Sequence, residues 1–110
     1  MYKVVRRYLA AYPDAFKLQR GDRVRFERRP SEWSGWIWCT RKDGRQGWIP
    51  ESWADLESEY CTMTREYDAT ELTVTEGELV ELLLLESDWG WAVKKNGMNG
   101  WVPMSHLERA

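Results

Sequence analysis

The feature that most constrains this chain is a four-residue phrase that occurs twice. GWIP at residues 47–50 and GWVP at residues 100–103 lie 53 positions apart in a chain of 110 residues. Aligning the two phrases brings further residues into register, at offsets that grow from 53 to 56 and 59 toward the N-terminus: Trp36 with Trp89, Trp38 with Trp91, residues 18–26 with 74–82, and Tyr8 with Tyr67. The offset changes by three between blocks, which predicts loops of different length between matched structural elements. The chain is therefore a divergent repeat of two small units.

The matched blocks have the pattern of short β-strands. In DRVRFER, Val24 and Phe26 alternate with charged residues, and Val80 and Leu82 take the same places in the second repeat. The aromatic-rich segments at residues 35–41 and 89–95 end near Asp-Gly and Asn-Gly turns, which is typical of hairpins. We therefore predict an all-β fold of two small five-stranded barrels in tandem. The expected core comprises Leu18, Val24, Phe26, Val74, Val80 and Leu82.

The repeat predicts domain boundaries and a charge asymmetry. We expect one domain over residues 1–56, a short linker over 57–61 that contains no proline or glycine, and a second domain over 62–110. Residues 1–56 hold 12 Lys/Arg and 7 Asp/Glu, net +5, whereas residues 57–110 hold 4 and 11, net −7. Opposite charges of this kind would favour docking of the two domains on each other.

The sequence also bears on the compartment. No run approaches the roughly 20 apolar residues of a membrane span, and the first residues do not form the apolar core of a signal peptide. We therefore expect a cytoplasmic protein. Cys39 and Cys61 are too few for a disulfide scaffold and occupy unrelated positions in the repeat, which favours a small buried side chain and an incidental thiol.

Each half resembles a Src-homology 3 (SH3) domain, of the divergent kind found as tandem pairs in bacterial proteins. The family landmarks are an aromatic first-strand motif, a Gly-acidic turn, an aromatic residue on the third strand, a glycine-aromatic-aliphatic-proline stretch, and one more aromatic three residues later. The first repeat has VVRRY at residues 4–8, Gly21-Asp22, Trp36, GWIP and Trp53. The second has MTREY at residues 63–67, Gly77-Glu78, Trp89, GWVP and His106.

The resemblance implies an aromatic groove that binds a proline-rich peptide in the polyproline II conformation. Carried over by position, the first groove consists of Tyr8, Trp36, Pro50 and Trp53, and the second of Tyr67, Trp89, Pro103 and His106. The family's acidic residue, which pairs with an Arg or Lys of the peptide, corresponds to Glu71, with Asp88 and Glu86 beside Trp89. This chain departs from the family at Arg6 and Arg65, which replace a groove tyrosine, and at His106.

The remaining tryptophans have more than one interpretation. We expect Trp36 and Trp89 to lie in the grooves, because the next residue on the strand faces the core. Trp38 and Trp91 share that face, where they either cover the barrel, seal the contact between the two units, or widen the groove. Trp48 and Trp101 combine packing with a place in the groove wall.

No catalytic constellation is visible. His106 is the only histidine and has no partner at metal-ligand spacing, so we expect no enzyme activity, metal or cofactor. The favoured function is a protein-interaction module, monomeric and without membrane association, that binds an extended, proline-rich peptide. A basic peptide is expected for the second domain. One alternative is a structural tandem whose docked domains occlude a groove. Another is nucleic-acid binding by the first half, which the net charge of −2 disfavours and which would use Arg20, Arg23, Arg25, Arg28 and Arg29.

Overall fold

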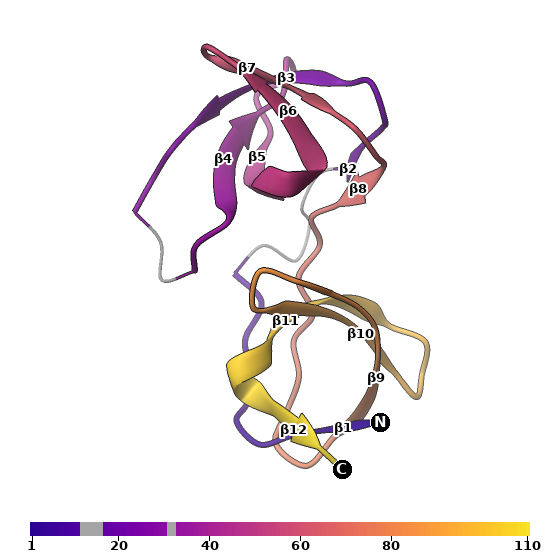
Figure 1. Ribbon diagram of the computed structural model, residues 1–110. Coiled ribbons are helices and arrows are strands. Elements are labelled where there is room, and N and C mark those ends of the chain that lie inside the picture. Colours follow the sequence, from indigo (N-terminus) through magenta and orange to yellow (C-terminus); the bar gives the residue numbers. More distant parts are fainter. Residues whose placement is uncertain (12–16, 31–32) are drawn as a thin grey trace. The chain divides into compact units, whose positions relative to one another are not determined.

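A computed structural model describes residues 1–11, 17–30 and 33–110 of the chain (Figure 1). The elements in chain order are β1 (Tyr2–Val4), β2 (Lys17–Leu18), β3 (Arg23–Glu27), β4 (Trp36–Thr40), β5 (Gln46–Pro50), the 3-10 helix η1 (Glu51–Trp53), β6 (Ala54–Glu57), β7 (Tyr60–Met63), β8 (Tyr67–Asp68), β9 (Leu79–Glu86), β10 (Trp89–Lys94), β11 (Asn99–Pro103), η2 (Met104–His106) and β12 (Leu107–Arg109). Two five-stranded sheets dominate the fold. The predicted all-β class with two SH3-like barrels is confirmed.

The two compact units do not follow the predicted boundaries. The central unit is Ala15–Ala69, and the terminal unit combines Met1–Asp14 with Thr70–Ala110. The central sheet has the strand order β5-β4-β3-β7-β6, with β2 and β8 as a separate pair. The terminal sheet has the order β11-β10-β9-β1-β12. Each unit therefore contains residues of both repeats.

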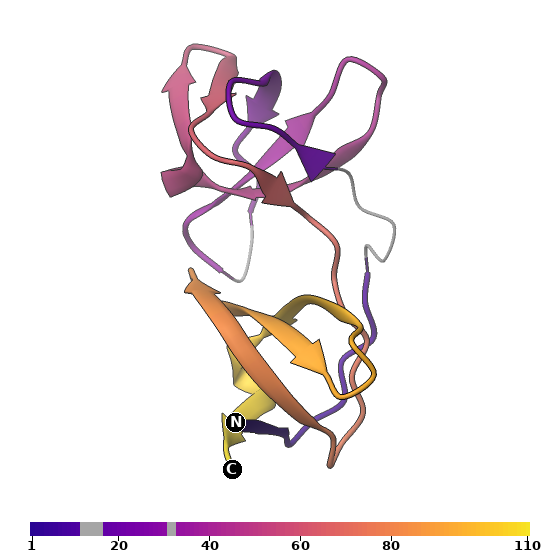
Figure 2. The same ribbon diagram turned by 90° about the vertical axis from the view of Figure 1, so that its right-hand side faces the viewer.

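The repeats have exchanged their first strands. β1, the first strand of the first repeat, pairs with β12 through Val4 and Leu107 and with β9 through Tyr2 and Val80. Figures 1 and 2 both show this N-terminal indigo segment running beside the orange and yellow strands of the terminal unit. The equivalent strand of the second repeat, β7, instead pairs with β6 and β3 in the central unit.

The turn between β6 and β7 explains the exchange. Glu57 pairs with Tyr60, so only Ser58 and Glu59 connect the two strands, and Ser58 has a left-handed φ of 51°. β6 is the last strand of the first repeat, and a two-residue hairpin returns the chain antiparallel beside it. β7 thereby takes the place that β1 would otherwise occupy, and β1 completes the terminal unit. The predicted linker at residues 57–61 is part of a hairpin and does not separate two domains.

The exchange continues into the loop that follows each first strand. In the terminal unit, Tyr8 and Val74 form an antiparallel bridge with both backbone N···O distances at 2.9 Å. In the central unit, β2 and β8 pair through Leu18 and Tyr67. In each of these two pairings, one residue comes from the first repeat and the other comes from the second repeat.

The cores are largely as predicted. Leu18 and Val24 are buried in the central unit, and Val74 and Val80 are buried in the terminal unit, where Val4 joins them from β1. Phe26 and Leu82 were also expected in the core, but both are half-buried. Phe26 lines an open surface pocket of about 350 Å³. Leu82 packs against the edge of the terminal core.

The glycine of the second phrase has a packing role. Trp101 N–H donates to the Thr70 carbonyl at 2.9 Å, and Leu72 N–H donates to the Trp101 carbonyl at 3.0 Å, so residues 70–72 run alongside β11. A Cβ on Gly100 would lie 3.0 Å from both Leu72 N and Thr70 O. Only glycine fits at this close backbone approach without displacement.

The exchange also removes the predicted charge asymmetry. The terminal unit holds six Lys/Arg and eight Asp/Glu, net −2, and the central unit holds ten of each, net zero. Arg25 of the first repeat now forms an ion pair with Glu59 of the second at 3.0 Å, and Lys17 pairs with Asp68 at 3.9 Å. These exposed pairs stabilise little individually. They nevertheless show that the opposite charges of the repeats meet inside one unit.

Candidate functional site

The first candidate site is an aromatic cluster in the terminal unit. Strand pairing between β10 and β11 sets Trp89 beside Pro103. The ring of Tyr8 packs edge-on against Trp89, with centroids 5.6 Å apart, and against His106 at 5.4 Å. We call Tyr8, Trp89, Pro103 and His106 the terminal aromatic cluster. Its members come from both ends of the chain.

Polar contacts hold the two outer rings of this cluster in place. The Tyr8 hydroxyl donates to Glu71 Oε1 at 2.5 Å, and the Ala11 N–H donates to the same oxygen at 2.9 Å. His106 Nδ1 lies 3.1 Å from the carbonyl oxygens of both Arg6 and Arg7. Because both partners are acceptors, Nδ1 carries the proton. The segment that supplies Tyr8 is thus also bonded to His106.

The central unit contains a second cluster. Trp36 lies beside Pro50 across β4 and β5, and Trp53 packs edge-on against Tyr67 with centroids 5.4 Å apart. We call these two pairs the central aromatic cluster; they are linked along the chain, because Trp53 ends the 3-10 helix that follows Pro50. The Tyr67 hydroxyl donates to the Trp48 carbonyl at 2.8 Å. The guanidinium of Arg65 lies 3.8 Å from the centroid of Trp53, so a cation covers one face of this indole.

The predicted groove sets are therefore wrong in one member each. The SH3 resemblance implies Tyr8 with Trp36 and Tyr67 with Trp89, but Tyr8 packs against Trp89 and Tyr67 packs against Trp53. They follow the exchanged first strands, whereas the tryptophans and prolines stay on strands that the repeats keep. Trp36 lies beside Pro50, and Trp89 lies beside Pro103.

Exposure differs between the clusters. In the terminal cluster, Tyr8 and His106 are half-buried, whereas Trp89 is only 7% exposed, contrary to the expectation of an open groove ring. The T-shaped contact of the Tyr8 ring with the indole contributes to this burial. In the central cluster, Trp36 is half-buried while Tyr67 is 3% exposed. Tyr8, His106 and Trp36 are thus the rings that a ligand can reach.

Carboxylates accompany the terminal cluster. Asp88 is exposed in a two-residue turn that joins β9 to β10, in which Ser87 and Asp88 have φ of 47° and 70°. Both positions are left-handed, as in a type I′ hairpin turn. The Asp88 carbonyl accepts a hydrogen bond from Met104 N–H at 2.9 Å, which ties this turn to η2. Glu71 and Asp88 therefore share the unit of Trp89, as predicted.

The other tryptophans form cross-strand pairs. Trp38 packs edge-on against Trp48 with centroids 5.1 Å apart, and Trp91 packs against Trp101 at 5.5 Å. The guanidinium of Arg29 lies 4.6 Å from the Trp38 centroid. Among the alternatives, this geometry supports a covering of the sheet surface. Aromatic residues at matching positions on paired strands were the available signal for these pairs.

Two further predictions concern cysteine and arginine side chains. Cys39 and Cys61 are buried, free thiols with Sγ atoms 4.0 Å apart. The hydrogen-bonded contact with Cys61, reinforced by burial, raises the pKa of Cys39 above its ordinary value.

Arg28 donates to both oxygens of Glu51, at 2.7 and 3.2 Å, and these hydrogen bonds lower the pKa of Glu51. With Arg25 and Arg29 also in ion pairs, much of the predicted basic cluster is neutralised.

No group of three or more His, Cys, Asp or Glu side chains among the described residues could hold a metal ion. None of the helices described here has the length and apolar character needed to cross a membrane.

Comparison with known proteins gives one family and no solved structure. The variant SH3 domain family matches residues 1–56 and, separately, residues 60–109. No solved structure matches the chain. The matches follow the repeats, whereas the compact units follow the exchanged strands. Since the two matches together cover nearly all of its residues, the chain belongs to the variant SH3 domain family.

Proposed function

We propose that this chain is a non-catalytic, cytoplasmic module whose terminal aromatic cluster binds an extended, basic, proline-containing peptide. SH3 domains are generally protein-interaction modules. The observation that carries the proposal is the packing of Tyr8 against both Trp89 and His106, in the unit that also holds Glu71 and Asp88. Aromatic rings and carboxylates are thereby combined on one unit.

The chemistry of the cluster suits such a ligand. A polyproline II segment presents apolar ridges and has no internal hydrogen bonds, so it loses little conformational entropy when it packs on aromatic rings. The accessible faces of Tyr8 and His106 supply those rings. The exposed carboxylate of Asp88 can pair with a lysine or arginine of the peptide, and the terminal unit has a net charge of −2.

The central cluster is less suited to the same ligand. Its tyrosine is buried with the hydroxyl bonded to the Trp48 carbonyl, and Arg65 covers Trp53 with a positive charge that repels a basic peptide. Trp36 remains accessible beside Pro50. We therefore assign basic-peptide binding to the terminal cluster and regard Trp36, Pro50, Trp53 and Tyr67 as a separate site with another preference.

The alternatives receive less support. Nucleic-acid binding relied on a basic first half, but the central unit has no net charge and Arg25, Arg28 and Arg29 form ion pairs. Electrostatic docking of oppositely charged domains relied on the same asymmetry.

The proposal is tested by selecting peptides from a library against the intact chain and titrating the best binder by NMR. We expect the indole N–H signal of Trp89 and the backbone amide signals of Trp89, His106 and Asp88 to shift. Asp88→Asn should weaken binding about threefold through loss of an exposed ion pair. Trp36→Ala, in the central cluster, is the matched control and should leave the affinity unchanged. A library that yields no binder, or shifts confined to the central unit, would contradict the proposal.

A further inference from the structure

We propose that the terminal unit also accepts residues 1–11 from a second copy of this chain. The product is a reciprocal dimer in which each terminal aromatic cluster takes its Tyr8 from the partner copy. The inference rests on strand pairing and not on the proposed function, so peptide binding can fail without affecting it.

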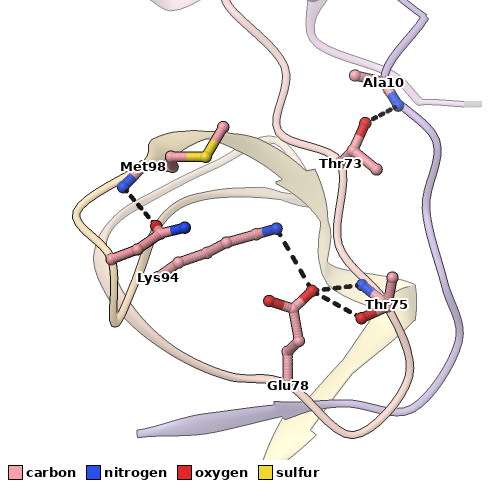
Figure 3. Close-up of polar contacts among 7 residues, drawn as sticks. Ala10, Thr73, Thr75, Glu78, Lys94 and Met98 are labelled. Atoms are coloured by element: carbon pink, nitrogen blue, oxygen red, sulfur yellow. Dashed lines mark hydrogen bonds and ion pairs between the residues drawn. The ribbon is translucent and has the colours of Figure 1, made fainter.

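The segment that would be donated is held by contacts along its whole described length. Val4 N–H donates to Glu78 O at 2.8 Å, and Val5 N–H donates to His106 O at 2.9 Å. Further along, Ala10 N–H donates to Thr73 Oγ1 at 3.0 Å (Figure 3). Each of these bonds joins residues 1–11 to residues 70–110. An identical segment from another copy can form every one of them.

The acceptor is the position of β1 in the terminal sheet. β1 lies between β9 and β12 and pairs with both, so its removal would leave two unpaired strand edges and open the core around Val4. Unpaired edges of this kind are templates for an added strand. The residue type is also specified, because Val4 is fully buried beside Leu107.

The chain already contains one such substitution. β7 of the second repeat occupies the first-strand place in the central unit, where it pairs with β6 of the first repeat. First strands of this fold are therefore accepted from a segment outside their own repeat. Donation between copies repeats that event with the same strand in the same register, which is domain swapping.

Concentration decides between the two forms. Within one chain, the donated segment and its acceptor are connected through the central unit, and such tethering gives an effective concentration on the order of millimolar. The monomer therefore dominates in dilute solution. The exchanged dimer becomes populated when the protein is concentrated or when the intramolecular donor is defective.

Two full-length variants with complementary defects test this directly. Val4→Asp places a carboxylate in the core contact of β1, so this chain cannot supply its own first strand. Val102→Asp disrupts the acceptor core and leaves residues 1–11 intact; both side chains are fully buried in the same core. Each variant alone should lose the dispersed NMR signals of residues 79–107. Signals of residues 36–63 report whether the central unit is still folded.

The expected result is complementation. Isotope-labelled Val4→Asp chain mixed with unlabelled Val102→Asp chain should regain the signals of residues 79–107, with saturation at one to one and twice the chain mass. The matched control replaces the partner with the Val4→Asp/Val102→Asp double variant, which has no functional donor segment. Absence of recovery at about 1 mM, recovery with the double variant as well, or terminal-unit signals that persist in Val4→Asp alone would each overturn the proposal.

Discussion

Cys39 and Cys61 lie side by side in the core of the central unit with their Sγ atoms 4.0 Å apart, although one comes from each repeat. Cys39 is on β4 and Cys61 is on the exchanged strand β7, and both strands flank β3. In two separate domains that followed the repeats, these thiols would belong to different cores. Their contact is therefore a direct mark of the strand exchange.

This contact predicts non-additive substitutions. Cys39→Ala and Cys61→Ala should each destabilise the chain, and the double variant should differ from the sum of the single variants by at least about 0.5 kcal/mol, because neighbouring residues share one cavity. The measurement is the free energy of urea unfolding in a double-mutant cycle. Cys39→Ala combined with Val102→Ala, in the other unit, is the control and should be additive. If the changes in unfolding free energy of the two cysteine variants were additive, the two thiols would not be in contact.

A second prediction is that a substitution in β1 destabilises the terminal unit, whereas a substitution in β7 destabilises the central unit. Val4→Ala should destabilise the terminal unit by about 2 kcal/mol, through lost burial and a small cavity. Met63→Ala, at the matching position of β7, should destabilise the central unit by about 3 kcal/mol. Hydrogen exchange resolves the two effects: Val4→Ala should lower protection of β10 and β11, and Met63→Ala that of β4 and β5. The opposite assignment would mean that each repeat keeps its own first strand.

A third prediction concerns fragments of the chain. The fragment of residues 17–69 contains β2 to β8 and should fold alone, although a chain of this size is only marginally stable. The matched fragment of residues 17–57 lacks β7 and β8 and should remain unfolded, because β2, β3 and β6 would each lose a partner. Amide dispersion in NMR spectra distinguishes the outcomes. Equal disorder in both fragments would show that β7 and β8 do not complete the central unit.

Glu78 predicts how the terminal unit responds to acid. Burial alone would raise its pKa, but hydrogen bonds from the Thr75 N–H at 2.7 Å and hydroxyl at 2.9 Å, with the Lys94 ammonium at 3.4 Å, hold the pKa below its ordinary 4.5 (Figure 3). A carboxylate with a lowered folded-state pKa stabilises the fold above its ordinary pKa, and this contribution is lost as the pH falls through the folded-state pKa.

The corresponding experiment compares the unfolding free energy of the wild-type chain and Glu78→Gln from pH 7 downward. The variant should be less stable at pH 7, and the difference should shrink below about pH 4.5, where the wild-type carboxylate takes up a proton. A difference that stays constant over this range would show that the ionised carboxylate of Glu78 contributes no stability.

Much of this architecture could be predicted from the repeat. The alternation around Val24 and Val80 predicted strands, and the Asp-Gly and Asn-Gly turns predicted hairpins. The SH3 resemblance grouped Trp36 with Pro50 and Trp89 with Pro103, which strand pairing sets side by side. These inferences succeed because the residues concerned lie close together in the sequence. Hairpin partners are determined by local turns and by alternation.

The pairing of first strands was not predictable in the same way. VVRRY and MTREY carry the same pattern, so either segment fits either barrel, and no local rule decides between them. The deciding feature is the two-residue turn at Ser58 and Glu59. It lacks the Asn-Gly or Asp-Gly signal of common hairpins. Because it falls between the two repeats, the sequence predicts a linker there. Tyr8 and Tyr67 directly follow these strands, so each was expected in the cluster where the other lies.

The measurement that tests this account most directly is nuclear Overhauser spectroscopy on the dilute, monomeric chain. The exchanged fold predicts cross-strand contacts of Val4 with Leu107 and of Met63 with Ala54, and ring contacts of Tyr8 with Trp89. Contacts of Val4 with Ala54, of Met63 with Leu107 and of Tyr8 with Trp36 would show instead that each repeat folds on itself, and would contradict the account.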